Sequence, residues 1–489
     1  MRDWTREEIQ RIGYLVVDLI ADHLSTLSGE PVFNPVPAAL ARQFLSTPAP
    51  ADPVEPEEVL QLFRSTIEPY PFGNGHPRFF GWVNSPPAVM GVFADALAAA
   101  MNPSCAGGNH AAIYVERQVI EWFRELLGFP STSMGLLVSG GSMATMTALA
   151  VARHVKSGVD VRVAGLREAP APFAFYLSSE AHSCARKAIE LLGFGSASIR
   201  TIATGADHCM EVEALEAALE EDRLERQVQP IAVIATGGTT NTGAIDDLDA
   251  IAAVCRRHDV WLHVDAAYGG PAILSTQYGD ALRAVAKADS VALDPHKWLF
   301  VPVEAGMVIV RDAEAMRSAF SLVPPYLRTD GNTAGVGGPP WFSEYGFQQT
   351  RGFRALKVWM AMQEFGVSGY KAAIEENIAL ANYLADCVRG TQDLALMAPP
   401  SLSVVCFRFV GPALADEGAT AALNRALLER LQLSGEAFLT STELAGRFVL
   451  RACIVNYRST RADVDQMLQA VQRIGGELVA SGQIDGRHR

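Results

Sequence analysis

The chain has 489 residues, of which 49% are hydrophobic and 19% are charged, a composition typical of a globular protein with two or more domains. Its formal net charge of -14 argues against nucleic-acid binding, which needs a basic face. Seven dispersed cysteines without a C-x-x-C pair, together with the lack of a signal segment or a membrane-spanning apolar run, predict a cytoplasmic protein that has no membrane partner.

The first predicted element is a helix with a capping-box start. The Thr5 hydroxyl can accept from the Glu8 amide while the Glu8 side chain reaches back. Apolar residues then follow at nearly helical spacing as far as Leu24, and Gly29 ends the element. Most of the helix surface is apolar, so we expect the helix to pack against its own domain or against a second subunit. A proline-rich connection follows over residues 31–56.

Predicted strands and helices alternate over residues 136–310, the pattern of a mostly parallel sheet with helices on both faces. A Gly-Ser turn opens the first of these helices. A plain glycine turn would look the same, but bare amides at a helix N-terminus also attract a phosphate. Functional residues gather at the carboxyl ends of such strands, so we expect one site there. Its candidates, each just after a predicted strand, are Ser142, His182, Thr240, Asp265 and Lys297.

Asp265 ends an apolar strand that begins at Trp261, and small residues follow it. A flat ring can approach a carboxylate in such surroundings. This suits the protonated nitrogen of pyridoxal 5′-phosphate (PLP), because a protonated ring acts as an electron sink. A helix-capping or salt-bridged aspartate is the alternative interpretation.

A second apolar strand, from Ser290, ends in Asp294 and is followed by Pro295, His296 and Lys297. Lysine is rarely buried without a partner. Burial disfavours the ammonium form and lowers the pKa of a lysine, and a neutral amine can form a Schiff base with a carbonyl. Lys297 is therefore either a surface residue at a strand end or an amine kept for reaction.

The two motifs are His263-Val264-Asp265-Ala266-Ala267-Tyr268 and Asp294-Pro295-His296-Lys297-Trp298. Their order and spacing resemble the group II PLP-dependent decarboxylases, most of all the aromatic-L-amino-acid decarboxylases that act on DOPA, tyrosine or tryptophan. The resemblance covers nearly the whole chain. It implies an α/β protein of PLP fold type I, like aspartate aminotransferase, and a homodimer with active sites at the subunit interface. The predicted parts are an N-terminal helical dimerisation segment (residues 1–78), a PLP-binding domain (79–369) and a small C-terminal α+β domain (370–489).

The resemblance also implies roles for individual residues. Lys297 would hold PLP, Asp265 would pair with the ring nitrogen, and His182 would stack over the ring. Tyr326, on a loop, would protonate the substrate carbon after carbon dioxide leaves, with help from His182. Aldehyde-forming relatives carry phenylalanine at the position of Tyr326, and some of them replace the histidine. The residues implied to bind the cofactor are Gly141, Ser142, His182, Thr240, Asp265, Ala267, Asp294, His296 and Lys297. Those implied to line the substrate pocket are Trp82, Phe80, Pro103 and Ser104, of which the last two stand where the family has bulkier residues.

The predicted reaction is the decarboxylation of an L-amino acid, aromatic by resemblance, to the amine and carbon dioxide. An acidic substrate would need a cation for its side chain, for which Arg78 and Arg351 are the candidates. Aldehyde formation and transamination are alternative PLP chemistries. A degenerate PLP-binding scaffold is the non-enzyme alternative, and the residues that argue against it are the intact Lys297, Asp265, His182 and Tyr326.

A metal site is a further alternative, because histidine and aspartate are common metal ligands. Its ligands would be His263, Asp265, Asp294 and His296. The spacing supplies no obvious third ligand, so we expect no metal.

Overall fold

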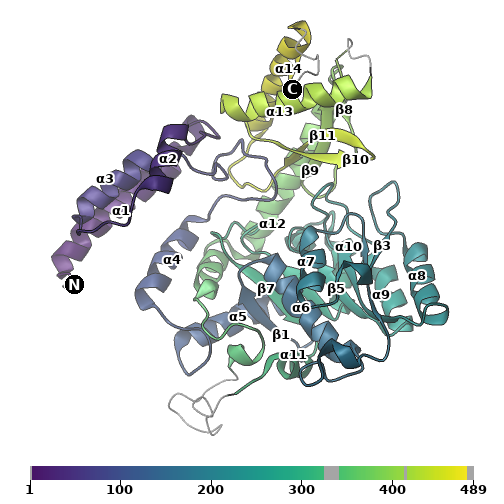
Figure 1. Ribbon diagram of the computed structural model, residues 1–489. Coiled ribbons are helices and arrows are strands. Elements are labelled where there is room, and N and C mark those ends of the chain that lie inside the picture. The colour runs from purple at the N-terminus through teal and green to yellow at the C-terminus, as the bar shows by residue number, and fades with distance from the viewer. Residues whose placement is uncertain (1–2, 324–340, 412–415, 482–489) are drawn as a thin grey trace. The chain divides into compact units, whose positions relative to one another are not determined.

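The computed structural model describes residues 3–323, 341–411 and 416–481 (Figure 1). The chain divides into two compact units. The larger unit comprises Val83–Asn382 and Ala398–Val405, and the smaller unit comprises Met1–Trp82, Tyr383–Met397 and Cys406–Arg489. The predicted domain boundaries at residues 78 and 369 stay a prediction.

A seven-stranded sheet forms the centre of the larger unit, in the order β1-β7-β6-β5-β4-β2-β3. Strands β2 to β6 pair in parallel, and β7 runs antiparallel to both of its neighbours. Most strand residues are buried because both sides of the sheet are covered. The predicted α/β class with a mostly parallel sheet is thus confirmed. The strands are β1 (Met134–Val138), β2 (Phe173–Ser178), β3 (Ile199–Ile202), β4 (Gln229–Thr236), β5 (Trp261–Asp265), β6 (Ser290–Leu293) and β7 (Gly306–Val310).

Helices connect and cover these strands. Helix α6 packs along the sheet from β7 to β4 and lies in front of the strands in Figure 1. In α9 the Asp247 side chain caps the helix, and the predicted apolar positions Leu248, Ile251 and Cys255 are buried. The helices of this unit are α4 (Val89–Met101), α5 (Ala111–Leu126), α6 (Gly141–Lys156), α7 (Ser183–Leu191), α8 (Val212–Leu224), α9 (Leu248–Arg257), α10 (Gly279–Leu282) and α11 (Ala313–Phe320). The helical segment α12 (Arg354–Arg389) is interrupted at Gly366, where the backbone is not helical; it begins in this unit and continues into the smaller one.

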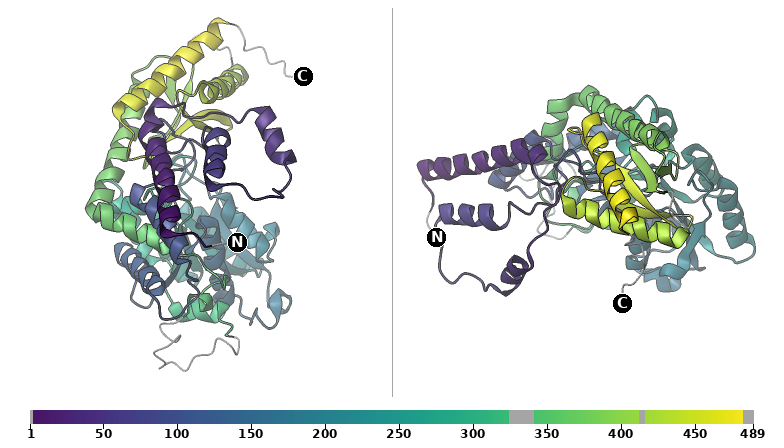
Figure 2. Two further views of the ribbon diagram at one scale, coloured as in Figure 1. Left: turned by 90° about the vertical axis from the view of Figure 1, so that its left-hand side faces the viewer. Right: turned by 90° about the horizontal axis from the view of Figure 1, so that it is seen from above.

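The smaller unit contains a four-stranded sheet in the order β10-β11-β9-β8. The pairs β10–β11 and β8–β9 are antiparallel. Helices α13 (Glu417–Ser434) and α14 (Arg461–Ala480) pack side by side (Figure 2). The predicted small C-terminal α+β region is therefore present. Its strands are β8 (Leu394–Leu396), β9 (Val404–Phe409), β10 (Thr440–Leu444) and β11 (Arg447–Cys453).

The N-terminal part of the smaller unit is helical, with α1 (Arg6–Thr26), α2 (Ala38–Ser46) and α3 (Pro56–Thr66). The capping box predicted at the start of α1 is confirmed, because the Glu8 amide donates to Thr5 Oγ1 at 3.2 Å and the Thr5 amide donates to Glu8 Oε2 at 2.8 Å. None of the residues of these three helices is buried. Across the described ranges, no helix has the length and hydrophobicity needed to cross a membrane.

Candidate active site

A cavity of about 350 Å³ lies at the carboxyl ends of the parallel strands of the larger unit, a size usual for small-molecule sites. It is lined by residues that follow β1, β2, β4, β5 and β6. The sequence predicted that these strand ends meet, and the structure brings their side chains together. The predicted cofactor-binding residues that line the cavity are Gly141, Ser142, His182, Thr240, Asp265, Ala267, Asp294, His296 and Lys297.

The N-terminus of α6 forms one wall of this cavity. Gly140 precedes the helix with a φ of 148°, a conformation that favours glycine. A Cβ atom on Gly306 would lie 2.4 Å from the Cα of Gly140, so β7 can approach the turn only without a side chain. The first amides of a helix have no partner within it, and the helix dipole favours an anion there. Gly141 and Ser142 thus stand where a phosphate can bind.

Lys297 lies one turn after Asp294, whose carbonyl accepts a hydrogen bond from the Lys297 amide at 2.9 Å. This turn brings Lys297 Nζ to 3.0 Å from Asp294 Oδ2, with the lysine side chain 26% exposed. Burial alone lowers the pKa of Lys297, but the Asp294 and Asp265 carboxylates outweigh it and raise the pKa. The net direction of the Lys297 pKa shift is thus opposite to the lowering expected from burial alone. Lys297 must lose a proton before its nitrogen can attack a carbonyl.

Asp265 ends β5 and is 9% exposed. Its Oδ1 accepts a hydrogen bond from the Ala267 amide at 3.1 Å, and the Cys184 thiol lies 4.0 Å from Oδ2. Burial, reinforced by the Asp265 charge, raises the pKa of Cys184 to about 12, so the thiol keeps its proton and can donate. The Asp265 carboxylate is thus held in place at the floor of the cavity.

His182 is the N-cap of α7, and its Nδ1 accepts from the Cys184 amide at 3.3 Å. The ring proton of the neutral imidazole therefore lies on Nε2. Burial lowers the pKa of His182, although the Asp265 carboxylate opposes this change. His182 is accordingly a neutral hydrogen-bond donor at neutral pH.

His263 is a core histidine. Its Nδ1 lies 3.0 Å from Ser290 Oγ and its Nε2 lies 3.3 Å from Thr145 Oγ1. Burial lowers the pKa of His263 to about 4. Both ring nitrogens are engaged, so His263 supplies no ligand to the metal site that was considered from the sequence.

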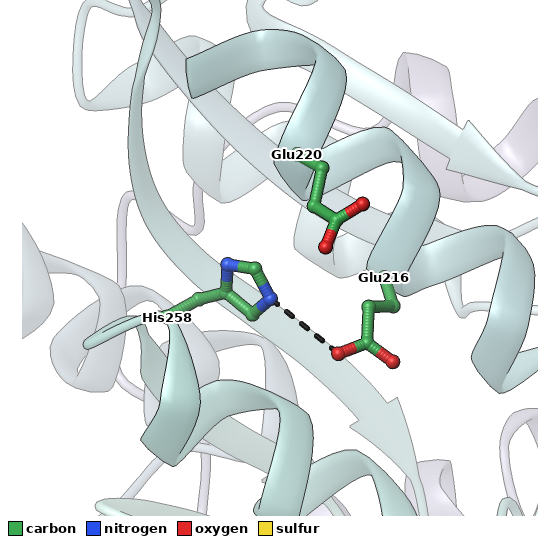
Figure 3. A group of neighbouring side chains, drawn as sticks. All are labelled: Glu216, Glu220 and His258. Carbon is green, nitrogen blue, oxygen red and sulfur yellow. Dashed lines mark ion pairs between the residues drawn. The ribbon is translucent and has the colours of Figure 1, made fainter. Parts of the chain in front are cut away.

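Outside the cavity, two glutamates and a histidine also lie close together, and these are side chains of the kinds that bind metals. Within the described ranges, Glu216, Glu220 and His258 are the residues whose ligand atoms all lie within 4.8 Å of one another (Figure 3). Glu216 and Glu220 lie on α8, and His258 follows α9 just before β5 begins, at the opposite edge of the sheet from the cavity. Glu216 already accepts two hydrogen bonds from Arg257 and lies 3.6 Å from His258 Nε2. These contacts are those of a surface ion-pair group.

Comparisons with known proteins show to which protein family the chain, and with it this cavity, belongs. The model of the pyridoxal-dependent decarboxylase conserved domain matches residues 37–410. The chain belongs to the pyridoxal-dependent decarboxylase family. This decarboxylase is therefore a PLP-dependent carboxy-lyase that acts on an amino acid.

Individual relatives agree with this membership. The decarboxylase is 35% identical to an aromatic-L-amino-acid decarboxylase of Bacillus atrophaeus over 477 residues, which cover 97% of each chain. It is 36% identical to an L-2,4-diaminobutyrate decarboxylase of Rhizobium meliloti over 409 residues, 83% of this chain and 79% of the relative. The crystal structure of Oryza sativa TDC with PLP and tryptamine matches with a TM-score of 0.89 and 28% identity, over 98% of this chain and 99% of that one. These matches confirm PLP fold type I.

The residues in the cavity suit PLP on chemical grounds. The amine of Lys297 suits an aldehyde, the Asp265 carboxylate suits a protonated ring nitrogen, and the α6 N-terminus suits a phosphate. In addition, Asp294 Oδ1 is buried and has no hydrogen-bond partner among the described residues. A buried polar atom without a hydrogen-bond partner indicates that a bound ligand or an added proton completes its hydrogen bonding.

The predicted substrate-pocket residues do not line this cavity. Phe80 and Trp82 belong to the smaller unit, where Phe80 is fully buried and Trp82 stacks on Phe72 with ring centroids 5.5 Å apart. Pro103 lines a separate cavity of about 370 Å³, and Ser104 is exposed. Their role at the substrate mouth stays a prediction. Tyr326 lies outside the described residues.

Sequence reasoning missed several residues that line the cavity. Cys184 lies two residues after His182 in the first turn of α7, and Tyr268 lies three residues after Asp265. The Tyr268 hydroxyl lies 2.6 Å from Ser403 Oγ, and its ring stacks on Trp298 at 5.2 Å. Closeness to a predicted strand end was the available signal. The other missed lining residues are Ser139, Gly140, Met143, Thr236 and Gly238.

Proposed function

We propose that this decarboxylase converts an aromatic L-amino acid (tyrosine, DOPA, phenylalanine or tryptophan) to the amine and carbon dioxide. The 35% identity to the Bacillus atrophaeus aromatic-L-amino-acid decarboxylase over 97% of both chains supports an aromatic substrate. The main observation against an acidic substrate concerns Arg78 and Arg351, the two arginines considered as partners for the acidic side chain of such a substrate. Both already bind other groups of the protein.

Arg351 is occupied by a buried ion pair. Its Nη1 donates to Glu116 Oε2 at 3.1 Å and to the Cys105 carbonyl at 2.8 Å, and its Nη2 donates to the Leu137 carbonyl at 2.6 Å. Arg351 is 3% exposed and Glu116 is fully buried. Removing one partner of such a pair leaves an uncompensated buried charge, so Arg351 is not free to bind a substrate.

Arg78 is held within the smaller unit. Its Nε donates to the Glu436 carbonyl at 2.7 Å, and its Nη1 donates to Gln466 Oε1 at 2.9 Å. Its guanidinium also lies 3.8 Å from Asp463 Oδ1. These contacts oppose a role for Arg78 in binding an acidic side chain.

In the proposed mechanism, Lys297 holds the cofactor and Asp265 keeps a proton on the ring nitrogen. Bound PLP supplies an electron sink for the pair of electrons that remains when carbon dioxide leaves. Lys297 is the one lysine or arginine among the described residues that line the cavity, so no arginine there holds the substrate carboxylate. A substrate carboxylate that has no strong cationic partner is lost more readily as neutral carbon dioxide. His182, as a donor through Nε2, and Tyr326 are proposed to deliver the proton to Cα.

The substrate proposal is tested by product analysis. The purified protein is incubated with PLP and a panel of amino acids, with the Lys297→Ala variant as the blank, and products are identified by mass spectrometry. We expect an amine that keeps the substrate nitrogen from at least one aromatic amino acid. A diamine from 2,4-diaminobutyrate alone, or an amine from glutamate alone, would overturn the aromatic assignment. Aldehyde or keto acid as the main product would overturn the reaction type instead.

We also propose that the enzyme is a homodimer with active sites at the subunit interface and that the N-terminal helices are covered by the partner subunit. In the single chain, exposed apolar side chains on α1 include Ile9 at 57% and Tyr14 at 66%. On α3 they include Leu62 at 58% and Phe63 at 39%. Apolar faces of this extent mark interaction surfaces. A second copy of the chain is the partner that the family resemblance supports.

Sedimentation analysis tests the dimer. We expect a dimer mass for the wild type at micromolar concentration. Leu62→Glu should weaken the dimer by about tenfold or more, because it places a charge in an apolar contact. Leu191→Glu is the matched control, since Leu191 on α7 is 76% exposed. A monomer mass for the wild type, or equal dissociation of both variants, would contradict the proposal.

We propose a cytoplasmic location because the cysteines are unpaired. All seven are free thiols, and five of the seven are buried. Unpaired cysteines are usual in a reducing compartment.

A further inference from the structure

Cys184 is a buried thiol that the proposed mechanism does not use. It is 5% exposed and lines the cavity beside Asp265. Its Sγ lies 4.0 Å from Asp265 Oδ2, whereas Asp265 Oδ1 accepts from the Ala267 amide at 3.1 Å. The contact is long because sulfur is a large atom, and a thiol is a weak donor. Within the described ranges, it is nevertheless the side-chain hydrogen bond that the Asp265 carboxylate accepts.

A network of side-chain hydrogen bonds reaches Cys184 from the core of the sheet. The Trp261 indole nitrogen donates to Ser290 Oγ at 2.8 Å, and Ser290 Oγ lies 3.0 Å from His263 Nδ1. His263 Nε2 lies 3.3 Å from Thr145 Oγ1, and the Thr145 hydroxyl forms a hydrogen bond with the Cys184 thiol. The four residues behind the thiol are each at most 4% exposed. This network therefore joins β6, β5, α6 and α7 away from solvent.

The first member of the network fixes the direction in which its protons point. An indole N–H can only donate, so Ser290 Oγ accepts from Trp261 and its own proton is left for His263 Nδ1. Burial lowers the pKa of His263 to about 4, so the neutral ring carries its proton on Nε2 and donates to Thr145. The Thr145 proton is then left for sulfur, and the thiol proton for Asp265 Oδ2. Every donor in the network thus points toward Asp265.

The thiol at the end of this network remains a donor at neutral pH. Burial raises the pKa of Cys184 to about 12, and the Asp265 charge raises it further, while the hydrogen bond from Thr145 opposes the rise, as a donor to sulfur does. Hydrogen bonds that align in one direction polarise one another. Cys184 is therefore a stronger donor to Asp265 than an isolated thiol would be.

We propose that Cys184 is a positioning residue that, with Thr145 and His263 behind it, controls how Asp265 holds the proton on the PLP ring nitrogen. A hydrogen bond to Oδ2 favours the charged carboxylate, so the proton between Asp265 and the ring stays on the nitrogen. It also restricts rotation of the carboxylate, whose Oδ1 is held by Ala267. A protonated ring is the better electron sink. This inference rests on the proposed pairing of Asp265 with the ring nitrogen.

Nitrogen NMR of the PLP-loaded enzyme tests the proposal without a measurement of turnover. The protein is stripped of PLP and reloaded with PLP that carries ¹⁵N in its ring. We expect Cys184→Ala to move the ring-nitrogen signal toward that of a neutral pyridine. Cys184→Ser keeps a donor and should move the signal less. The kcat of Cys184→Ala should fall by about two- to tenfold, as expected for the loss of one hydrogen bond.

The hydroxyl of Thr145 provides a second, matched test. Thr145→Val keeps the shape of the side chain but removes the hydroxyl, so the ¹⁵N signal should move in the same direction as in Cys184→Ala. The double variant should move little further, because Thr145 acts through Cys184. Thr147→Val is the control and should leave the signal unchanged. Thr147 is a buried residue of the same helix, donates to the Met143 carbonyl at 2.8 Å and does not line the cavity.

Asp265→Asn separates a failure of this proposal from a failure of the mechanism on which it rests. An unchanged ¹⁵N signal in Asp265→Asn would mean that Asp265 does not pair with the ring nitrogen, and both would then be wrong. If Asp265→Asn moves the signal but Cys184→Ala and Thr145→Val do not, the hydrogen-bond network alone is refuted. An equal movement in Thr147→Val would also refute it, because altered packing would then be the cause. If Cys184→Ala does not bind PLP, Thr145→Val decides between these outcomes.

Discussion

Replacing Lys297 with alanine should lower kcat for amine formation by about a thousandfold or more, because the variant lacks the amine that attacks the cofactor carbonyl. The cavity supplies no substitute, since Lys297 is the one lysine among its described lining residues. The alanine leaves the α6 N-terminus and Asp265 in place, so cofactor binding should be weakened but not abolished.

The measurement combines steady-state kinetics with chemical trapping. Borohydride reduction of the loaded wild type should fix the cofactor to the peptide that contains Lys297, and the variant should show no such adduct. Lys287→Ala serves as the control, because Lys287 is exposed and pairs with Asp249 away from the cavity. Its kcat should stay within about twofold of the wild type, as is usual for surface changes. Wild-type turnover by Lys297→Ala would refute the assignment of this lysine.

The position of the cavity could be predicted because it follows from local patterns. Apolar runs that end in polar residues predicted the parallel strands, and parallel strands bring their carboxyl ends to one edge of the sheet. Ser142, His182, Thr240, Asp265 and Lys297 were placed together on that reasoning alone, and they line one cavity. Their individual roles come from the family resemblance and remain to be tested.

The electrostatics of the site could not be predicted in the same way. Burial of Lys297 suggested a lowered pKa, whereas the sum of two carboxylates raises it. One of them, Asp294, is a near neighbour in sequence, but its effect depends on a turn that brings its Oδ2 to 3.0 Å. The other, Asp265, reaches Lys297 only because β5 and β6 pair in parallel.

Long-range partners were also invisible in the sequence. Arg351 was a candidate for binding an acidic substrate until the structure placed it against Glu116, which is 235 residues away in the chain. Similarly, His263 fitted a metal-ligand pattern, and its engagement by Ser290 and Thr145 follows only from the packing of β5 against β6 and α6. Side-chain availability depends on tertiary contacts, which local sequence patterns do not contain.

Replacing Asp265 with asparagine should lower kcat by about 10²- to 10⁴-fold, the range expected when a group that controls a proton in the reaction is lost. The amide has nearly the shape of the carboxylate, so it can still accept from the Ala267 amide, which lies 3.1 Å from Oδ1. It carries no charge, however, and cannot hold a proton on the ring nitrogen. The control is Asp246→Asn, another buried carboxylate, which accepts from the Met210 and Thr236 amides and does not line the cavity. Asp246→Asn should lower the free energy of unfolding with little effect on kcat.

A cofactor analogue separates the proposed role of Asp265 from a purely structural one. If Asp265 acts through the ring nitrogen, then the wild type loaded with a PLP analogue that has carbon in place of that nitrogen should lose activity to a similar extent. Combining the analogue with Asp265→Asn should add little further loss, because both changes remove the same interaction. If the analogue and Asp265→Asn instead reduce activity independently, so that their fold-losses multiply, then the Asp265 carboxylate acts elsewhere. It would then act, for example, through Lys297, whose pKa it helps to raise. The size of the coupling between the two changes therefore measures how much of the effect of Asp265 passes through the cofactor ring.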